Sequence, residues 1–305
     1  MNRHLSLRDA ALGLLIVAIW GTNFVVIRVA LDALPPLLMA GLRFAVVLIP
    51  AIFFLPRPPV GWANLALYGL TLGAGQFGLL FIAMDGHISP GLASLVVQMQ
   101  VFFTIGIAMW RAGPARERIA PHHIVAVLLS LAGMLVIGAH NGRGVTVLGL
   151  VLVLSAGMCW SIANQAMREA AAGVKINMLA YVVWTSLFAV PSLLLMSLVI
   201  EGWPAIVKGV TQASAVTWAT VVWQSIGNTL FGYTAWNWLQ SRYSAATITP
   251  LSLLVPVFGM GASAWWLGEP LQDWKVLASL LVMAGLAVNI LWPRWRKAPL
   301  AAESA

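Results

Sequence analysis

Residues 89–137, SPGLASLVVQMQVFFTIGIAMWRAGPARERIAPHHIVAVLLSLAGMLVI, return in diverged form as residues 241–289. The two stretches align without a gap, so that Glu117 falls on Glu269 and Gly133 on Gly285. The further identities are Ala93 with Ala245, Ala126 with Ala278, Leu128 with Leu280, Leu129 with Leu281, and Ala132 with Ala284. Several matches at one constant offset indicate an internal repeat rather than chance similarity of apolar segments.

The beginnings of the two halves match as well. Trp20 precedes Arg28 by the same spacing as Trp160 precedes Arg168. A glycine-containing stretch around Gly142 then divides the chain. We therefore predict two copies of one unit, residues 1–142 and residues 143–305.

The composition places the chain in a membrane. It is 61% hydrophobic and 9% charged, whereas a soluble domain is about 25% charged. The formal charge of +8 comes mostly from Lys and Arg between apolar runs, where it reports membrane orientation rather than nucleic-acid binding. The single cysteine, Cys159, excludes an intramolecular disulfide and a cysteine-based metal cluster.

Apolar segments long enough to cross a bilayer follow one another along the whole chain. A spanning helix needs about 20 predominantly apolar residues, and the first such run is too long for a signal peptide. The predicted segments are 8–31, 36–55, 62–84, 91–111, 119–139, 146–168, 177–200, 213–239, 245–267 and 272–292. This pattern predicts an all-α integral membrane protein of ten transmembrane helices.

The distribution of positive charges predicts the orientation. One side would carry Arg3, Arg8, Arg57, Arg111, Arg116, Arg118, Arg168, Lys175, Arg242, Arg294, Arg296 and Lys297. The other side would carry Arg143, Lys208 and Lys275. The positive-inside rule then places both termini in the cytoplasm. Because each copy has five helices, an odd number, the two repeats are inverted, which is typical of transporters that alternate access to one central site.

Acidic side chains are confined to loops and helix ends. They are Asp9, Asp32, Asp85, Glu117, Glu169, Glu201, Glu269, Asp273 and Glu303. Proton-coupled carriers often hold a carboxylate near the middle of the membrane, so we expect facilitated diffusion rather than obligatory proton antiport. The histidines are also peripheral. The sequence therefore predicts no enzyme, no metal site and no cofactor.

Uncharged polar side chains near mid-depth are the candidates for a central site, because buried amides require partners in the bundle interior. Trp20 and Asn23 share one helix face, as do Trp160 and Asn164 at the equivalent place in the second half. The polar residues near mid-depth are Asn23, Gln76, Gln98, Gln100, Asn164, Gln224, Asn228 and Ser252.

Helix breakers and small residues indicate places that move. Pro250 and Pro256 remove backbone hydrogen bonds around Ser252. Freed carbonyls at this depth are tolerated only where they face protein or water. Gly73 and Gly227 are candidate hinge positions in the third and eighth segments. Each of these features has a simpler alternative, namely a kink or a close helix contact without a functional role.

Two arginines, Arg28 and Arg43, fall inside predicted spans. A charge at such depth costs about 2.5–3.5 kcal/mol at a helix centre on insertion scales. For Arg28 we favour a side chain that extends to the membrane interface. For Arg43 both alternatives stay open: extension to the interface, or attraction of a substrate carboxylate.

The residues resemble a known family. WGTNF at 20–24, GLRF at 41–44, SPGLAS at 89–94 and TPLSLLVP at 249–256 are similar to the EamA-type branch of the drug/metabolite transporter superfamily. The likeness spans nearly the whole chain and is strongest to bacterial exporters of cysteine, O-acetylserine and aromatic amino acids. It implies two inverted EamA repeats, a central cavity and export across the bacterial inner membrane. One departure is Gly113-Pro114-Ala115-Arg116-Glu117, where the family often has a Gly-Glu pair.

We therefore predict an inner-membrane exporter of neutral and aromatic amino acids and their derivatives, with broad specificity. One chain would suffice as a monomer in the lipid bilayer. Amides would bond the amino and carboxyl groups of the substrate, aromatic rings would contact its side chain, and Arg43 would attract it. The predicted substrate-binding residues are Trp20, Asn23, Gln98, Gln100, Trp160, Asn164, Asn228, Tyr233 and Ser252. The alternatives are a carrier of nucleotide sugars or drugs with the same fold, and a membrane enzyme or lipid flippase.

Overall fold

The structure is a computed structural model that describes residues 6–111, 121–140, 142, 144–172, 174–243 and 248–295. The regular secondary structure of the described residues is helical, apart from one isolated antiparallel bridge between Ile88 and Val145. The elements of the first half are α1 (Leu7–Ala30), α2 (Pro36–Ala51), α3 (Trp62–Gly69), the π-helix η1 (Leu70–Gly78), α4 (Leu79–Met84), α5 (Pro90–Val96), the 3₁₀ turn η2 (Val97–Met99), α6 (Gln100–Arg111) and α7 (Pro121–Ala139).

The second half repeats this order with an added helix. Its elements are α8 (Val147–Ala171), α9 (Met178–Met196), the π-helix η4 (Ser197–Glu201), α10 (Trp203–Gln212), α11 (Ala215–Val222), the π-helix η5 (Trp223–Tyr233), α12 (Thr234–Arg242), the 3₁₀ helix η6 (Thr249–Leu254), α14 (Val255–Leu267) and α15 (Asp273–Trp295). Because η1 continues α3 into α4, and η5 continues α11 into α12, each of these runs is one long helix with a widened middle.

Local sequence signals set the helix boundaries. The side chains of Ser6, Thr146, Asn177 and Ser214 accept backbone N–H groups at the starts of α1, α8, α9 and α11, which satisfies donors that a helix leaves free. Proline stands in the first turn of α2 and of α5. Gly268 ends α14 in a left-handed conformation, with φ +65°.

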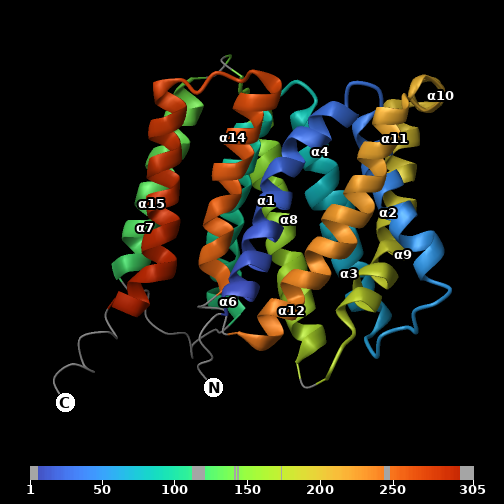
Figure 1. Cartoon of the computed structure of the whole chain (residues 1–305), viewed down its shortest axis with the longest axis horizontal. Helices are drawn as coiled ribbons and strands as arrows, with labels where there is room; N and C mark the ends of the chain where they lie inside the picture. The colour runs from blue at the N-terminus through green and yellow to red at the C-terminus, as the bar shows by residue number, and fades with distance from the viewer. Residues whose placement is uncertain are drawn as a thin grey trace.

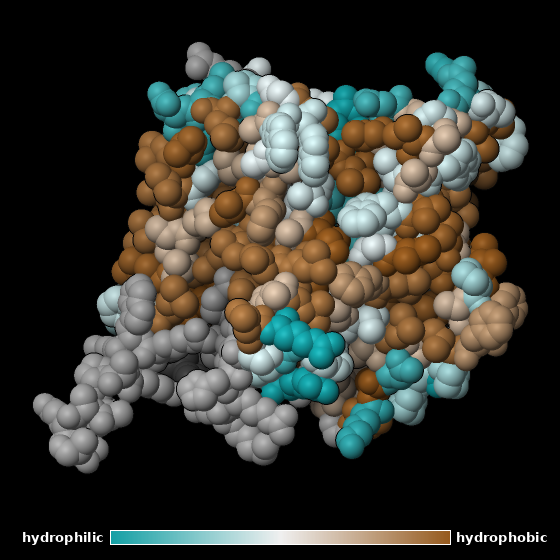
Figure 2. Space-filling model, viewed as in Figure 1, coloured by the Kyte–Doolittle hydropathy of each residue, from teal (hydrophilic) through white to brown (hydrophobic). Residues whose placement is uncertain are grey.

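The surface fits a bilayer. Figure 2 shows an apolar band around the middle of the visible face, with hydrophilic residues gathered at its two ends. Seven helices in the described part are long and apolar enough to cross a membrane, and Pro36–Ala51 and Leu251–Leu267 are apolar but shorter. The chain is therefore a multi-pass membrane protein, while the number of ten spans stays a prediction.

Corresponding helices of the two halves pack against corresponding neighbours in the opposite half. α1 packs on α14 while α8 packs on α6, and α1 packs on η5 while α8 packs on η1. The pairs α2–α9, α7–α15 and α5–α14 join elements that occupy corresponding places in the two halves. Figure 1 shows α7 and α15 side by side at one edge of the bundle.

The contact between α7 and α15 is reciprocal at the level of residues. A Cβ on Gly133 would lie 2.8 Å from the carbonyl oxygen of Ala278, and a Cβ on Gly285 would lie 2.5 Å from that of Ala126. These are the residue pairs that the sequence repeat relates to each other. The close approach needs glycine at both places, and its reciprocity supports the predicted two-fold relation of the halves.

Some predicted boundaries differ from the structure, and one helix was not predicted. The second helix ends at Ala51 rather than at residue 55, and the eighth continues to Arg242. The connection before the eighth helix contains α10, which sequence reasoning assigned to a loop. Gly209 of α10 lies so close to the loop after α1 that a Cβ there would meet Pro35 at 2.7 Å, so α10 covers the turn between α1 and α2.

Candidate functional site

Arg43 is the most unusual side chain in the described bundle. It lies in the middle of α2 and is 0% exposed. Its guanidinium donates from Nε to Thr229 Oγ1 at 2.9 Å and from Nη1 to Gln224 Oε1 at 3.0 Å. Its Cζ lies 3.8 Å from the ring centroid of Phe77. The charge is thus held by neutral groups.

These contacts offset the cost of burying a cation, but they supply no countercharge. Hydrogen bonds from a charged group contribute about 1.5–3 kcal/mol, and a desolvated cation–π contact about 2 kcal/mol. No ion pair is found for Arg43 within the residues that the structure describes. A buried charge without a countercharge is strongly unfavourable, so such an arrangement points to a function.

The π-helix η5 builds the other side of this cluster. Its buried polar residues are Gln224, Ser225, Asn228 and Thr229, and their spacing matches the wider turn of a π-helix. The Thr229 hydroxyl donates to the carbonyl of Gln224 at 2.8 Å, which leaves its oxygen lone pair to accept from Arg43. Ser225 Oγ donates to the carbonyl of Arg43 at 2.9 Å, so η5 is also fixed to the backbone of α2.

Asn23 of α1 completes the cluster. It is 4% exposed, and its Nδ2 donates to Gln224 Oε1 at 3.3 Å. The cation fixes the orientation of both amides. Arg43 requires an acceptor, so Gln224 must present Oε1, and this oxygen in turn requires the NH₂ group of Asn23.

Three atoms of this cluster are buried without a hydrogen-bond partner: Arg43 Nη2, Gln224 Nε2 and Asn23 Oδ1. Buried polar groups are normally satisfied, and an unsatisfied one costs about 1–3 kcal/mol. The set consists of two donors, one of them charged, and one acceptor. We refer to Arg43, Gln224 and Asn23 as the arginine cluster.

A second polar cluster lies between α6 and α8. Asn164 Nδ2 donates to Gln100 Oε1 at 3.4 Å, and Thr104 Oγ1 donates to the carbonyl of Gln100 at 2.8 Å. Ser161 Oγ donates to the same carbonyl at 2.8 Å. We call Gln100, Thr104, Ser161 and Asn164 the glutamine cluster. Its polar groups bond to one another without a cation.

An aromatic group stands beside the arginine cluster. Trp20, which lies three residues before Asn23 on α1, has its ring centroid 5.5 Å from that of Tyr233 and 5.2 Å from that of Trp236. Gly232 makes room for it, because a Cβ there would lie 2.6 Å from the indole nitrogen. The structure therefore brings Trp20, Asn23 and Tyr233 of the predicted set together at α1 and η5.

Other predicted residues lie elsewhere. Gln98 is buried on the 3₁₀ turn η2, and Trp160 packs half-buried against the core. Asn228 is buried on η5, and Ser252 lies on η6. Pro256 stands in the first turn of α14 rather than inside a helix. The side chain of Pro250, and Glu117 and Arg143, lie outside the described residues.

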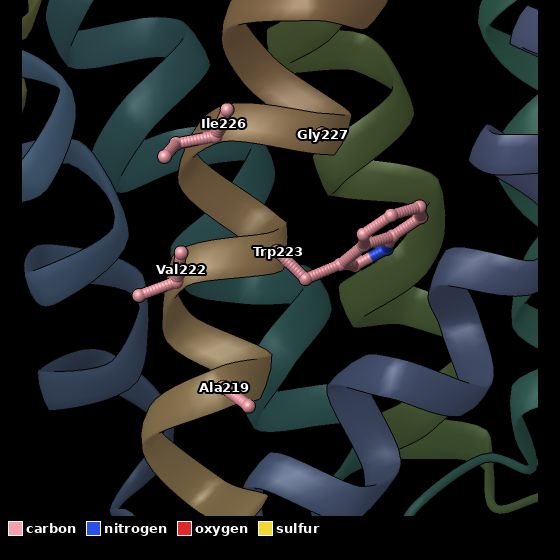
Figure 3. A pocket seen from close by; sticks show the side chains of 5 residues that line it. All are labelled: Ala219, Val222, Trp223, Ile226 and Gly227. Carbon is pink, nitrogen blue, oxygen red and sulfur yellow. The ribbon is translucent and has the colours of Figure 1, made fainter.

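The two predicted hinge glycines have different surroundings. A Cβ on Gly73 would lie 2.4 Å from the Cβ of Ala189 on α9, so Gly73 sits in a tight contact between helices. Gly227 instead lines an open apolar groove of about 430 Å³ with Ala219, Val222, Trp223 and Ile226. In Figure 3, Trp223 projects to one side of the helix and Val222 and Ile226 to the other. Val222, Trp223 and Ile226 are exposed, whereas Gln224 of the same run of residues is buried.

Two carboxylates secure the end of the bundle where α2 and α5 begin. Glu201 accepts the N–H groups of Leu37 at 2.6 Å and Leu38 at 3.1 Å, at the start of α2. Glu269 accepts from Ser89 and Gly91 near the start of α5, and its Oε1 lies 2.8 Å from Nζ of Lys275. Both acidic residues belong to the second half and hold helices of the first half, where their charge is favourable.

Arg28 behaves differently from Arg43. It is partly exposed and pairs with Asp32 at 2.6 Å at the end of α1, which agrees with an arginine that extends to the interface. Sequence reasoning gave the central role in the site to neither Gln224 nor Thr229. Their spacing of five residues, with Asn228 between them, is the available signal, and it is a signal only if the helix is a π-helix.

Comparison with known proteins decides the family. The model of the EamA-like transporter family matches residues 8–139 and again residues 147–291. The chain belongs to the EamA-like transporter family. The EamA-like fold is also seen in a solved crystal structure that aligns with a TM-score of 0.60 over 95% of this chain and 99% of that chain, at 20% identity.

Several curated EamA-like relatives match over nearly their full length. A probable amino-acid metabolite efflux pump of Escherichia coli is 37% identical over 297 residues, which are 96% of this chain and 98% of that protein. Its counterpart in Salmonella typhimurium is 38% identical over 296 residues, with the same coverage. A probable terminal-alkyne amino-acid exporter of Streptantibioticus cattleyicolor is 25% identical over 281 residues, which are 89% of this chain and 90% of that protein.

Proposed function

We propose that this transporter exports amino acids or related metabolites from the cytoplasm. The observation that carries the proposal is the arginine cluster: a fully buried guanidinium, held by neutral groups, whose Nη2 amino group has no hydrogen-bond partner. Buried arginines in membrane proteins mark substrate pathways, and a guanidinium is well suited to bind a carboxylate. The relatives named as amino-acid metabolite efflux pump and amino-acid exporter support the same class of substrate.

Transport would proceed by alternating access between two inverted five-helix repeats. The exchanged helix partners and the reciprocal glycine contacts of α7 and α15 support this arrangement. The distribution of Lys and Arg supports an orientation in the inner membrane with both termini in the cytoplasm. The contacts of Glu201 and Glu269 would then close the outer end.

We expect facilitated diffusion with broad specificity. The buried polar side chains of the described bundle interior include amides and hydroxyls around Arg43, and the carboxylates of Glu201 and Glu269 bind helix starts instead. A nucleotide sugar would place two phosphates in the site. Arg43 and Lys275 are the buried cations of the described chain, and Lys275 is paired with Glu269, so an amino acid fits the available charge better.

Counterflow in proteoliposomes tests the proposal. Purified protein is reconstituted into vesicles loaded with one unlabelled amino acid, and uptake of the same labelled amino acid is measured for L-phenylalanine, L-alanine, L-cysteine and O-acetylserine. We expect saturable counterflow for several of them, without a need for a pH gradient. Counterflow of none of them would contradict the amino-acid assignment, and accumulation driven by a proton gradient would contradict facilitated diffusion.

A further inference from the structure

The free polar atoms of the arginine cluster differ in chemical type, and their types match one ligand. Arg43 Nη2 and Gln224 Nε2 are donors, and Asn23 Oδ1 is an acceptor. They belong to three side chains joined through a single atom, because Gln224 Oε1 accepts both from Arg43 at 3.0 Å and from Asn23 at 3.3 Å. These side chains come from α2, η5 and α1, so the free atoms stand where three elements meet.

We propose that the arginine cluster binds the α-carboxylate and the α-ammonium of a free amino acid. The carboxylate accepts from Arg43 Nη2 and Gln224 Nε2, and the ammonium donates to Asn23 Oδ1. This inference rests on the proposed function and adds Gln224, which was not among the predicted substrate-binding residues, to the groups that bind the substrate carboxylate.

Chemistry favours a zwitterion over a simple anion or a simple amine. A cation that is already buried gains from a carboxylate, since a charge-assisted bond is stronger than a neutral one. An anion alone would leave Asn23 Oδ1 unpaired, and an amine alone would leave Arg43 Nη2 unpaired and add a second positive charge. A site with buried polar groups rejects ligands that leave them unpaired.

The environment also explains why the side chain of the substrate can vary. The ring of Phe77 covers one face of the guanidinium of Arg43, with Cζ 3.8 Å from the ring centroid. A substrate carboxylate therefore approaches Arg43 at the edge of the guanidinium plane, where the N–H groups point. The aromatic group of Trp20, Tyr233 and Trp236 begins one helical turn from Asn23. Aromatic rings accept apolar side chains of different shapes without specific hydrogen bonds, whereas the two charged groups are common to all amino acids.

The test uses ligands that lack one group each. Counterflow of L-phenylalanine is challenged with unlabelled L-phenylalanine, L-phenylalaninamide, phenethylamine and 3-phenylpropionate, and counterflow of L-alanine with L-alanine, L-alaninamide, ethylamine and propionate. For either transported amino acid we expect each analogue to need at least about tenfold more for half-inhibition, since it leaves a buried polar atom unpaired. Analogues that compete as well as the parent would overturn the inference while leaving the proposed function intact. If only L-cysteine or O-acetylserine is transported, its amide and its decarboxylated amine serve as the analogues, and counterflow of none of the four amino acids would overturn both.

The variant Asn23→Leu assigns the ammonium to its acceptor. We expect it to remove the preference for L-phenylalanine over 3-phenylpropionate, while the preference over L-phenylalaninamide remains. If Asn23 had only a structural role, Asn23→Leu would reduce the preferences over 3-phenylpropionate and over L-phenylalaninamide together, or it would reduce neither of them. Gln165→Leu removes an amide from α8, where Gln165 bonds Glu169, and serves as the matched control with both preferences kept.

Discussion

Asn23 and Asn164 follow the equivalent tryptophans Trp20 and Trp160 by three and four residues, and the clusters around the two asparagines differ in one decisive respect. Each asparagine donates its amide N–H to a glutamine, Asn23 to Gln224 and Asn164 to Gln100. In the glutamine cluster the remaining partners are hydroxyl groups. In the arginine cluster a buried cation takes part, and three polar atoms are left without partners.

The difference arises on the helices α2 and α9, which pack against each other. α2 carries Arg43, whereas the buried polar residues of α9 include Thr185 and Ser186, whose hydroxyls donate to Val182 O of their own helix at 2.9 and 2.8 Å. The two amide pairs use different elements, because Gln224 lies on η5 and Gln100 on α6, and the arginine makes only the first of them a charged cluster. The proposed site therefore predicts that the arginine cluster, and not the glutamine cluster, determines the affinity for the substrate.

Arg43→Met should have the largest effect on transport, because it removes the cation that distinguishes the arginine cluster from the glutamine cluster. We expect counterflow of amino acids to fall about 100-fold or more, since truncation of one member of a buried charged contact costs about 2–5 kcal/mol. The folded yield should persist, because apolar replacement of a buried charge is often neutral for stability. Arg28→Met removes an arginine from the exposed pair with Asp32 and should change counterflow by less than about twofold. Equal losses in the two variants would contradict the comparison.

Gly73→Ala and Gly227→Ala compare how tightly the π-helices η1 and η5 are packed. In Gly73→Ala the new methyl group would lie 2.4 Å from Cβ of Ala189, and overpacking of this kind costs about 1–3 kcal/mol. Gly227→Ala adds the same methyl beside the open groove, where the nearest atoms belong to the exposed ring of Trp223 at 3.0 Å, and should be nearly neutral. Thermal unfolding of the detergent-solubilised variants measures both. Equal destabilisation would show that η5 is packed as tightly as η1.

Asn23→Leu and Asn164→Leu compare the two clusters directly. We expect the first to raise the half-saturating amino-acid concentration about tenfold, which corresponds to 1.4 kcal/mol, and the second to raise it about threefold or less. The reason is that Asn23 has a buried acceptor without a partner, whereas Gln100 and Asn164 are partly exposed and bond to each other. Concentration-dependent counterflow gives the ratio. A larger effect at Asn164 would move the site to the glutamine cluster.

Glu201→Ala should have the smallest effect, because it acts on Arg43 only through the position of α2. The change frees the N–H groups of Leu37 and Leu38, and loss of a helix cap costs about 1 kcal/mol. We expect a lower unfolding temperature with a change of about threefold or less in half-saturation. Glu201→Gln keeps one acceptor oxygen, so its unfolding temperature should lie between that of Glu201→Ala and that of the unmodified protein. Unchanged stability in Glu201→Ala would show that α2 does not depend on this cap.

Much of the architecture can be read from the sequence, because a bilayer imposes long apolar helices and the repeat fixes their order. Trp20, Asn23, Tyr233 and Arg43 were also within reach, since polar and aromatic residues in apolar runs are conspicuous. Gln224 was predicted as a polar residue near mid-depth but not as a substrate-binding residue, and Thr229 was not predicted at all. A pattern of 3.6 residues per turn puts the two on different faces, whereas η5 widens the turn. α10 was missed since its mixed sequence resembles a polar connection.

The most direct test of the central claim is binding of labelled amino acid to the purified variant Gln224→Glu. Glutamate keeps the oxygen that accepts from Arg43 and Asn23, and it replaces the free Nε2 donor by a carboxylate oxygen. The variant should fold, but its own carboxylate would occupy the place of the substrate carboxylate. We predict loss of saturable binding in Gln224→Glu and retention of binding in Gln165→Glu, which introduces the same charge on α8. Binding in Gln224→Glu equal to that of the unmodified protein would contradict the account.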